Sequence, residues 1–248
     1  MANQLNVKDI EKLFELGAHL GHKKSRLDPK AKKNVYAIMN GTSIIDLTKT
    51  VEQLKKAKNF LVESKSEGKV LLVVGTKKVA SPFIREYCTK QGLPYISSKW
   101  LPGLLTNFET LIKNVQKLKT LKTGRDTGEW ESLVKHERVQ LGKEISKLER
   151  LYGGLETLSK RPDVLVIIDA KKEKNALKEA QSYKIPVVSL LDTNSNPEKV
   201  DYPVVANDDS TQVIEYIMNE LLTAYTEAKT KEIKEEVKPT PAPAVATS

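Results

Sequence analysis

The 248-residue sequence is poor in cysteine and in large aromatic side chains, with one Cys, two Trp and four Phe. The single Cys88 has no partner for an internal disulfide or a thiolate metal site, which excludes a disulfide-stabilised fold. The longest aliphatic runs, Val70 to Val74 and Val164 to Ile168, are much shorter than the roughly 18 residues that cross a bilayer. The N-terminal stretch lacks an apolar signal core and carries Asp9 and Glu11. We therefore expect a cytoplasmic protein without membrane contact.

Motifs of catalysis and nucleotide binding are also missing. The sequence contains no GxGxxG after a strand, no GxxxxGK[ST] and no GxSxG, so a dinucleotide site, a Walker-type phosphate site and a serine hydrolase are not expected. A shorter turn, Gly75-Thr76-Lys77, follows an aliphatic strand. For a small nucleotide we interpret it as an ordinary strand-to-helix turn, whereas Lys77 and Lys78 favour contact with an RNA phosphate. No cofactor is predicted.

Negative charge is scarce in the first part of the chain. Residues 1–100 carry 19 basic and 9 acidic side chains, whereas residues 161–248 carry 11 basic and 15 acidic ones, within a formal net charge of +9. The densest stretch is residues 22–33, HKKSRLDPKAKK, where six Lys or Arg side chains accompany one Asp. Such cations repel one another unless an anion compensates them. A solvated surface is the alternative, but the asymmetry favours contact with RNA phosphates.

Aliphatic strands alternate with helical patterns over much of the chain. Strands that are apolar on both faces and separated by helices indicate a parallel sheet covered on both sides, which is an α/β fold. The predicted strands are residues 70–74, 95–97, 164–168 and 187–191. The predicted helices are one that follows the loop of residues 75–78 and ends near Gln91, one over residues 172–183, and a last one that begins near Asp209 or Ser210.

The N-terminal part has its own pattern. A short amphipathic helix with Asn6 as its cap is expected to end near Gly21. Two short strands, 35–39 and 42–45, flank Asn40-Gly41, a pair that tolerates the positive φ angles of a tight hairpin turn. A helix capped by Thr48 and stopped by Gly68 is predicted next.

Apolar residues change their spacing between residues 104 and 155. Steps of three and four predict an antiparallel coiled-coil hairpin that stands off the sheet; the alternative is that both helices cover the sheet. The insertion divides the α/β domain into residues 1–103 and 156–229. Residues 230–248 lack apolar periodicity and are predicted to form a disordered tail. The seam residues are Leu104, Phe108, Leu111, Val115 and Leu118, then Val134, Leu141, Ile145, Leu148 and Tyr152.

Acidic side chains follow the predicted strands. Asp169 and Asp192 come directly after aliphatic strands, and Asp208 precedes the last helix. Ligands favour that edge of an open sheet, so one hypothesis is that these carboxylates bind a divalent cation. The rival function that follows is a metal-dependent enzyme for phosphoryl transfer. The alternative, which we favour, is that these carboxylates cap helices, because Asp209 and Ser210 lie where a helix begins.

Two further groups of residues leave alternatives open. Lys99-Trp100 offers a cation and an aromatic ring on which an unpaired base could stack, but Trp100 is equally compatible with the core. His19 and His22 form a close pair, yet no third ligand lies nearby in the sequence, so metal binding has weak support.

Several motifs resemble the bacterial-type small-subunit ribosomal protein S2 family and occur in that family's order. The resemblance covers about residues 5–225 and implies a flavodoxin-like or Rossmann-like α/β domain with an inserted coiled-coil hairpin. It also implies a structural role in the small ribosomal subunit without catalytic activity. The motifs are Leu13 to His22 (LFELGAHLGH), Gly41 to Thr50 (GTSIIDLTKT), Gly75 to Lys77 (GTK), Lys99 to Phe108 (KWLPGLLTNF), Pro162 to Pro186 and Asp192-Thr193-Asn194.

Partners and site residues follow from the same resemblance. It implies binding to small-subunit rRNA and to neighbouring ribosomal proteins, including the large mRNA-binding ribosomal protein S1, rather than a free homo-oligomer. The chain departs from the family at Pro102, which removes a backbone donor and fixes φ. Lys99 stands where the family commonly has Arg, so bidentate phosphate binding is lost there. The predicted rRNA-binding residues are Lys23, Lys24, Arg26, Lys30, Lys32, Lys33, Lys99, Trp100 and Asn107, to which charge alone adds Lys77 and Lys78.

Overall fold

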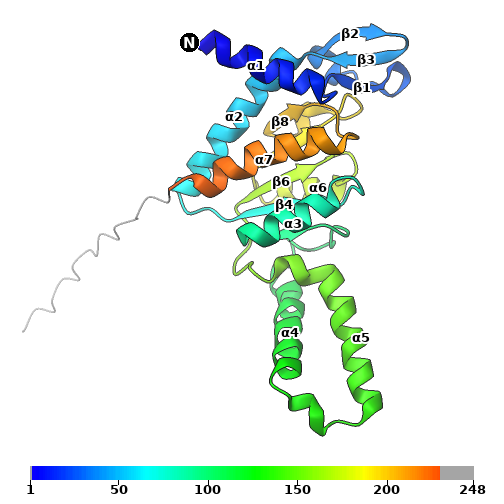
Figure 1. The fold of residues 1–248 in the computed structure, drawn as a ribbon, viewed down its shortest axis with the longest axis vertical. Coiled ribbons are helices and arrows are strands. Elements are labelled where there is room, and N and C mark those ends of the chain that lie inside the picture. The colour runs from blue at the N-terminus through cyan, green and yellow to red at the C-terminus, as the bar shows by residue number, and fades with distance from the viewer. Residues whose placement is uncertain (1, 230–248) are drawn as a thin grey trace, which may run out of the picture.

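The structure, a computed structural model, describes residues 2–229, with side chains described from residue 7 onward. Within this range the chain forms an α/β fold with a five-stranded sheet and a separate three-stranded sheet (Figure 1). The predicted α/β class is therefore confirmed. The tail predicted for residues 230–248 lies outside the described residues.

The five-stranded sheet is parallel throughout, in the order β5-β4-β6-β7-β8. Every residue of β4, β6 and β7 is buried, because each of these strands has a neighbour on either side and packed elements on both faces. Since the strands are parallel, the loops that follow them gather along one edge of the sheet. The bounds are β4 Leu71–Val74, β5 Tyr95–Ile96, β6 Val164–Ile168, β7 Val187–Leu191 and β8 Tyr202–Val205.

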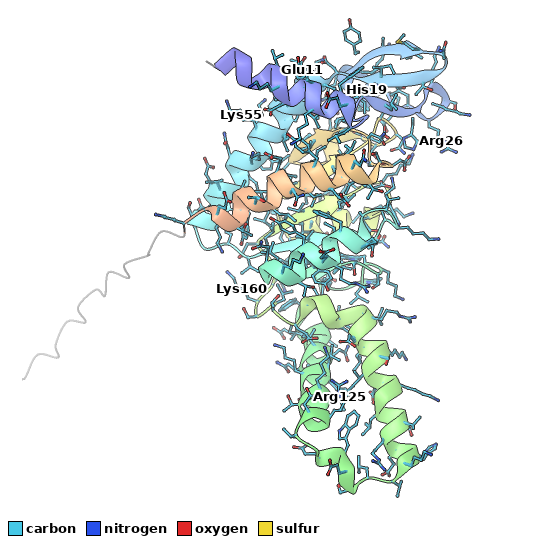
Figure 2. All side chains as sticks on the ribbon, viewed as in Figure 1. Glu11, His19, Arg26, Lys55, Arg125 and Lys160 are labelled. Atoms are coloured by element: carbon cyan, nitrogen blue, oxygen red, sulfur yellow. The ribbon has the colours of Figure 1, made fainter. Side chains whose placement is uncertain are left out.

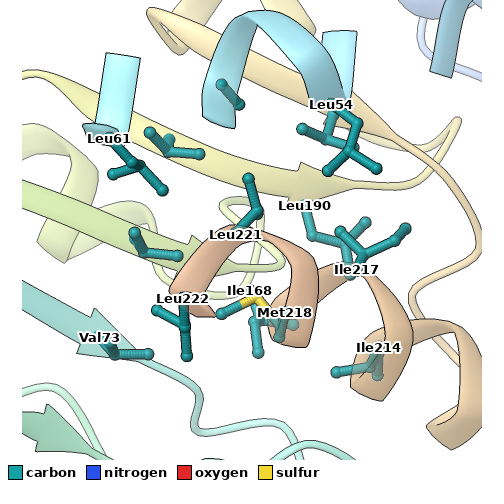
Figure 3. Close-up of a cluster of buried hydrophobic side chains, with 14 of the residues drawn as sticks. Leu54, Leu61, Val73, Ile168, Leu190, Ile214, Ile217, Met218, Leu221 and Leu222 are labelled. Carbon is teal, nitrogen blue, oxygen red and sulfur yellow. The ribbon is translucent and has the colours of Figure 1, made fainter. Parts of the chain in front are cut away.

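One face of this sheet is covered mainly by α2, α3 and α7 (Figure 1). Figure 3 shows Leu61 of α2, Leu221 of α7 and Leu190 of β7 in a single apolar cluster, and all three are fully buried. Burial of one such leucine contributes about 1.5–3 kcal/mol to stability. The helix bounds are α2 Leu47–Ser66, α3 Ser81–Gln91 and α7 Thr211–Glu227.

The opposite face has a second apolar cluster beneath α6 (Lys174–Ser182) and the loop of residues 97–107. Leu72 and Leu165 point to this face, whereas their neighbour Val73 points to the first, as the alternation of side chains along a strand requires. The sheet is therefore the middle layer of three.

Two long helices, α4 (Phe108–Asp126) and α5 (Lys135–Tyr152), lie next to each other and extend away from the sheet (Figure 1). We call residues 108–152 the helical arm. Lys117 of α4 pairs with Glu144 of α5, and Asn114 Nδ2 donates a hydrogen bond of 3.1 Å to the Tyr152 hydroxyl. None of the described helices is long and apolar enough to cross a bilayer. The side chains buried within the arm include Val115, Leu118, Ile145 and Tyr152.

The three-stranded sheet is antiparallel, in the order β1-β3-β2. Its strands β2 (Val35–Met39) and β3 (Thr42–Ile45) have the predicted bounds. The turn between them is also as predicted, since Asn40 and Gly41 have φ angles of 49° and 77°. Strand β1 (Leu20–Lys23) was not predicted from the sequence.

Three predicted helix ends are wrong. Asn6, predicted to cap the first helix, lies within it, because α1 already begins at Ala2. The first helix, α1, spans Ala2–Glu15 and stops well before Gly21, because Gly17 has a φ of 80° and the amide of Ala18 donates back to the Leu13 carbonyl (2.9 Å), a helix-ending arrangement. α2 is capped by Asp46 rather than Thr48, since the Asp46 carboxylate accepts a hydrogen bond of 3.1 Å from the Thr48 amide.

Candidate nucleic-acid interface

The basic segment, residues 22–33, begins at the end of β1 and leads into β2. It contains two short 3-10 turns, Lys24–Arg26 and Ala31–Asn34, rather than a regular helix. Figure 2 shows Arg26 at the rim of the molecule near the three-stranded sheet, far from Arg125 on the helical arm. The segment therefore lies on the surface, as its polarity predicts.

The base of the segment is held firmly against the loop that follows β7. The Asp28 amide donates to the Thr193 carbonyl (2.9 Å), and the His22 amide donates to the Thr193 hydroxyl (3.0 Å). Gly21 permits this approach: a Cβ atom there would lie 2.8 Å from Thr193 Cγ2 and 3.0 Å from the Ser43 carbonyl oxygen. Any larger residue at position 21 would force the segment away from this loop.

The His22 side chain adds a second anchor that sequence analysis missed. Its Nδ1 lies 2.8 Å from a carboxylate oxygen of Asp192, and its Nε2 lies 3.0 Å from the amide nitrogen of Asn194. The only signal in the sequence was that His22 falls within one resembling motif and Asp192 within another. Spacing gives no hint of this pair, because 170 positions separate the two residues.

The cations of the basic segment differ in whether a carboxylate of the protein pairs with them. Lys30 and Lys33 each lie 3.2 Å from the Glu198 carboxylate, and hydrogen bonds from Lys33 and Lys30 lower the pKa of Glu198. The remaining four form no ion pair with any residue that the structure describes, and all four are exposed. These free cations are Lys23, Lys24, Arg26 and Lys32.

Lys77 is not a free cation, which corrects the interpretation of the Gly75-Thr76-Lys77 turn as a phosphate site. Its ammonium lies 2.7 Å from Asp208 and 2.6 Å from Asp209, and its side chain is only 17% exposed. Burial lowers the pKa of Lys77, but the two carboxylates outweigh burial and raise it above its ordinary value. Lys78 is exposed and remains a candidate.

Asp192, Asp208 and Asp209, which we call the carboxylate cluster, meet beside this lysine. Burial raises the pKa of Asp208 to about 6; the hydrogen bond from Lys77 opposes this shift, and the charges of Asp169 and Asp192 add to it. A hydrogen bond from Lys77 lowers the pKa of Asp209. His22 and the cluster offer ligand atoms within 4.8 Å of one another, a spacing at which such groups could hold a metal ion. In the structure the adjacent positive charge comes from Lys77.

The last helix begins where the sequence predicted, because the N-cap of α7 is Ser210. The expectation that Asp208 and Asp209 cap it is wrong, since no side chain makes a capping hydrogen bond there. Asp169 does stabilise a turn, since its carboxylate accepts from the Lys172 amide (3.1 Å), with its own φ at 61°. Asp208 and Asp209 instead bind Lys77 from across the sheet edge.

Trp100 belongs to the core. It is 7% exposed, and its Nε1 donates a hydrogen bond of 2.9 Å to the Glu179 carboxylate, so its ring is not available to a base. Glu179 also accepts from the amides of Gly103 (2.9 Å) and Leu105 (3.0 Å), and it orders the loop despite Pro102. Sequence analysis missed Glu179, because nothing in a helical run of charged residues marks one that turns inward.

The remaining candidates, Lys99 and Asn107, are exposed at the two ends of that loop. The loop follows β5, at the far edge of the sheet from β7 and β8. The basic segment and Lys99 therefore both lie at the carboxyl ends of the strands, but β4 and β6 separate them.

Comparison with known proteins identifies the family of this chain. The family model of ribosomal protein S2 matches residues 13–228. The chain belongs to the ribosomal protein S2 family. The small ribosomal subunit protein uS2 of Coprothermobacter proteolyticus (strain ATCC 35245 / DSM 5265 / OCM 4 / BT) is 41% identical over 223 residues, which are 90% of this chain and 83% of that relative. Ribosomal protein S2 is structural, so the rival hypothesis of a metal-dependent enzyme is wrong.

Proposed function

We propose that this member of the ribosomal protein S2 family is a structural constituent of the small ribosomal subunit in the cytoplasm and binds small-subunit rRNA through its basic segment. The observation that carries the proposal is the set of four exposed cations, unpaired within residues 7–229, on a segment anchored by His22 and Asp28. Cations that have no internal partner are the ones that release counterions when they meet phosphates. Lys77 and Trp100 are not part of this surface.

The anchoring gives the segment an advantage over a flexible basic tail. Its turns are held by the Thr193 contacts and by the Lys24 amide, which donates to the Gly41 carbonyl of the β2–β3 turn (2.8 Å). Little backbone freedom remains to be lost on binding, so more of the electrostatic free energy appears as affinity. Because lysines bind phosphates as point charges, the contacts position the protein and supply little sequence readout.

Other candidates extend this surface along the same edge of the sheet. Lys78, Lys99 and Asn107 are exposed there and are proposed as weaker rRNA contacts. Lys30 and Lys33 join them when Glu198 releases them.

The helical arm is proposed to be an antiparallel coiled-coil hairpin inserted at residues 104–155, between the two parts of the α/β domain. The ion pair of Lys117 with Glu144 and the narrow apolar strip between α4 and α5 support this. An extended arm of this kind reaches neighbouring proteins, and we propose other small-subunit proteins, including ribosomal protein S1, as partners in place of a homo-oligomer.

Binding of the full chain to protein-free small-subunit rRNA over a series of salt concentrations tests the main proposal. For the wild type we expect affinity to fall steeply with salt. Replacement of Lys23, Lys24, Arg26 and Lys32 with Gln is expected to reduce the log–log slope by about three units, at roughly 0.7–0.9 per lost phosphate contact.

The matched control replaces four exposed lysines that make no ion pair with described residues and lie on α2 and the helical arm, namely Lys55, Lys56, Lys113 and Lys119. It removes the same four positive charges from a different surface, so its slope should stay close to that of the wild type. Equal losses in the two variants would mean that net charge, rather than the basic segment, governs binding.

A further inference from the structure

Tyr36 is the most exposed large apolar side chain in the described part of the protein, with 79% of its surface accessible. It lies in β2, directly after the turn that carries Lys32. Its hydroxyl makes no hydrogen bond with any described residue. An aromatic ring this exposed leaves about 100 Å² or more of apolar surface in water, so it invites a partner.

The ring lies on the exposed face of β2, at a β-bulge. In the pairing of β2 with β3, Val35 lies opposite Ile45 and Ala37 lies opposite Ile44. Two steps along β2 thus correspond to one step along β3, and Tyr36 is the extra residue. Bulges are frequent beside functional sites. The rim of the three-stranded sheet presents Tyr36 as a fixed feature of the fold.

Other rings of the protein have partners within the chain, and Tyr36 differs from them. Phe14 stacks on His19 with ring centroids 4.2 Å apart, and Phe60 stacks on Tyr202 at 4.0 Å. Tyr216 is covered by the ammonium of Lys12, and Trp100 is bound to Glu179. Among the described residues, neither a ring nor a cation covers Tyr36.

The charge around Tyr36 identifies the kind of partner. Residues 29–45 contain Lys30, Lys32 and Lys33 and no acidic residue; Glu198, from a distant segment, pairs with Lys30 and Lys33 and leaves Lys32 free among the described residues. Strand β1, the other edge of this sheet, ends in the free cation Lys23, opposite Thr42 of β3. A protein partner that buried Tyr36 would have to desolvate these lysines, whereas a nucleic acid brings phosphates for them and a base for the ring.

We propose that Tyr36 is a stacking platform for one unpaired base of the rRNA strand whose phosphates meet the basic segment. This inference rests on the proposed rRNA binding and adds to it a single-stranded substrate at a defined residue. Every base has a π-face, so stacking on tyrosine adds affinity without demanding one sequence. The neighbouring Ile38 and Met39, 42% and 61% exposed, extend the apolar surface beside the ring.

Aromatic and non-aromatic replacements of Tyr36 test this in the full chain. Tyr36→Leu keeps an apolar side chain but removes the ring, and we expect binding to protein-free small-subunit rRNA to weaken roughly 5- to 150-fold. Tyr36→Trp should bind at least as tightly as the wild type. The slope against salt should be the same in all three proteins, because no charge changes.

Ultraviolet cross-linking of the wild-type complex supplies a second readout. A peptide carrying a nucleotide on Tyr36 is expected by mass spectrometry, and Tyr36→Leu should lose it. Because Tyr36 is exposed, circular dichroism of both variants should match that of the wild type.

The outcomes separate the inference from the proposed function. Wild-type affinity in Tyr36→Leu, with weakened binding when Lys23, Lys24, Arg26 and Lys32 are replaced, would overturn the stacking role and leave rRNA binding intact. Salt-independent binding of the wild type would overturn the proposed function itself. A loss of small-subunit incorporation that Ile38→Ser and Met39→Ser share with Tyr36→Leu, at unchanged rRNA affinity, would show a protein-docking surface and overturn the inference.

Discussion

The basic segment and the carboxylate cluster lie side by side at one edge of the sheet, yet they treat their cations in opposite ways. Lys23, Lys24, Arg26 and Lys32 are exposed and unpaired among the described residues, whereas Lys77 is largely shielded from solvent and forms ion pairs with Asp208 and Asp209. His22 joins the two regions through Asp192. A lysine therefore either stabilises the fold through an internal ion pair or stays available to bind a ligand. Its burial and its carboxylate neighbours determine which of the two it does.

The difference has a simple physical origin. A buried charge is costly unless a counter-charge compensates it, so Lys77 and Asp208 depend on each other. An exposed charge is hydrated at little cost and contributes little to folding, but it remains available for phosphates. The predictions below change one region at a time, from the largest expected effect to the smallest.

The largest effect is expected when Lys77 loses its charge. Lys77→Met leaves Asp208 buried beside Asp192 and Asp169 without its cation, and we expect the free energy of unfolding to fall by about 3–5 kcal/mol at pH 7. Lys32→Met, made in the basic segment, should change it by no more than about 0.5 kcal/mol. Urea denaturation followed by circular dichroism measures both. Similar losses of unfolding free energy in Lys77→Met and Lys32→Met would show that the paired lysine contributes no more to stability than the exposed one.

The pH dependence of stability sharpens the same contrast. The pKa of Asp208 is about 6 in the folded protein, whereas the ordinary value of an aspartate, 3.8, applies to the unfolded chain. The folded state therefore binds this proton more tightly, and the stability that it contributes is complete below pH 4 and lost as pH rises through 6. The shift corresponds to a loss on the order of 3 kcal/mol.

Asp208→Asn removes this titration while the amide oxygen still accepts from Lys77. Relative to the wild type, the variant is expected to gain about 3 kcal/mol in unfolding free energy between pH 4 and pH 7. Denaturant titrations at several pH values give the difference, in which the contributions of other groups cancel. A difference that stays constant with pH would show that Asp208 is ionised throughout this range.

The smallest effect concerns the paired cations of the basic segment itself. Glu198→Gln removes the charge that holds Lys30 and Lys33, and we expect rRNA affinity at low salt to rise roughly two- to threefold without a change in stability. Glu86→Gln is the control, because Glu86 pairs with Lys90 on α3, away from the segment. An equal gain in both variants would attribute the effect to net charge.

Local patterns were sufficient to predict much of the fold. The apolar strands at β4, β6 and β7 and the Asn40-Gly41 hairpin appear where hydrophobicity and turn chemistry placed them. The errors concern ends and edges. β1 is stabilised by pairing with β3 rather than by its own residues, and the end of α1 depends on the left-handed Gly17. Both features depend on the conformation or position of other segments, which periodicity does not report.

The candidate site was predicted less completely. The exposed lysines of residues 22–33 were identified correctly as a surface feature, because charge density alone keeps such a run in water. Lys77 was grouped with them because of its charge and Trp100 because of the family resemblance, and each has a carboxylate partner within the protein instead. Tyr36 was passed over, because a single tyrosine in a predicted strand carries no mark of a bulge.

By itself the sequence determined the alternation of strands and helices, the position of the β2–β3 hairpin and the surplus of positive charge near the amino end. These properties depend on neighbours a few positions apart. Only the tertiary structure decided which cations stay free, because their partners are distant along the chain: 131 positions separate Lys77 from Asp208, and 165 separate Lys33 from Glu198. Electrostatic pairing acts through space over a few ångströms, so the fold must bring the charges together before their roles exist.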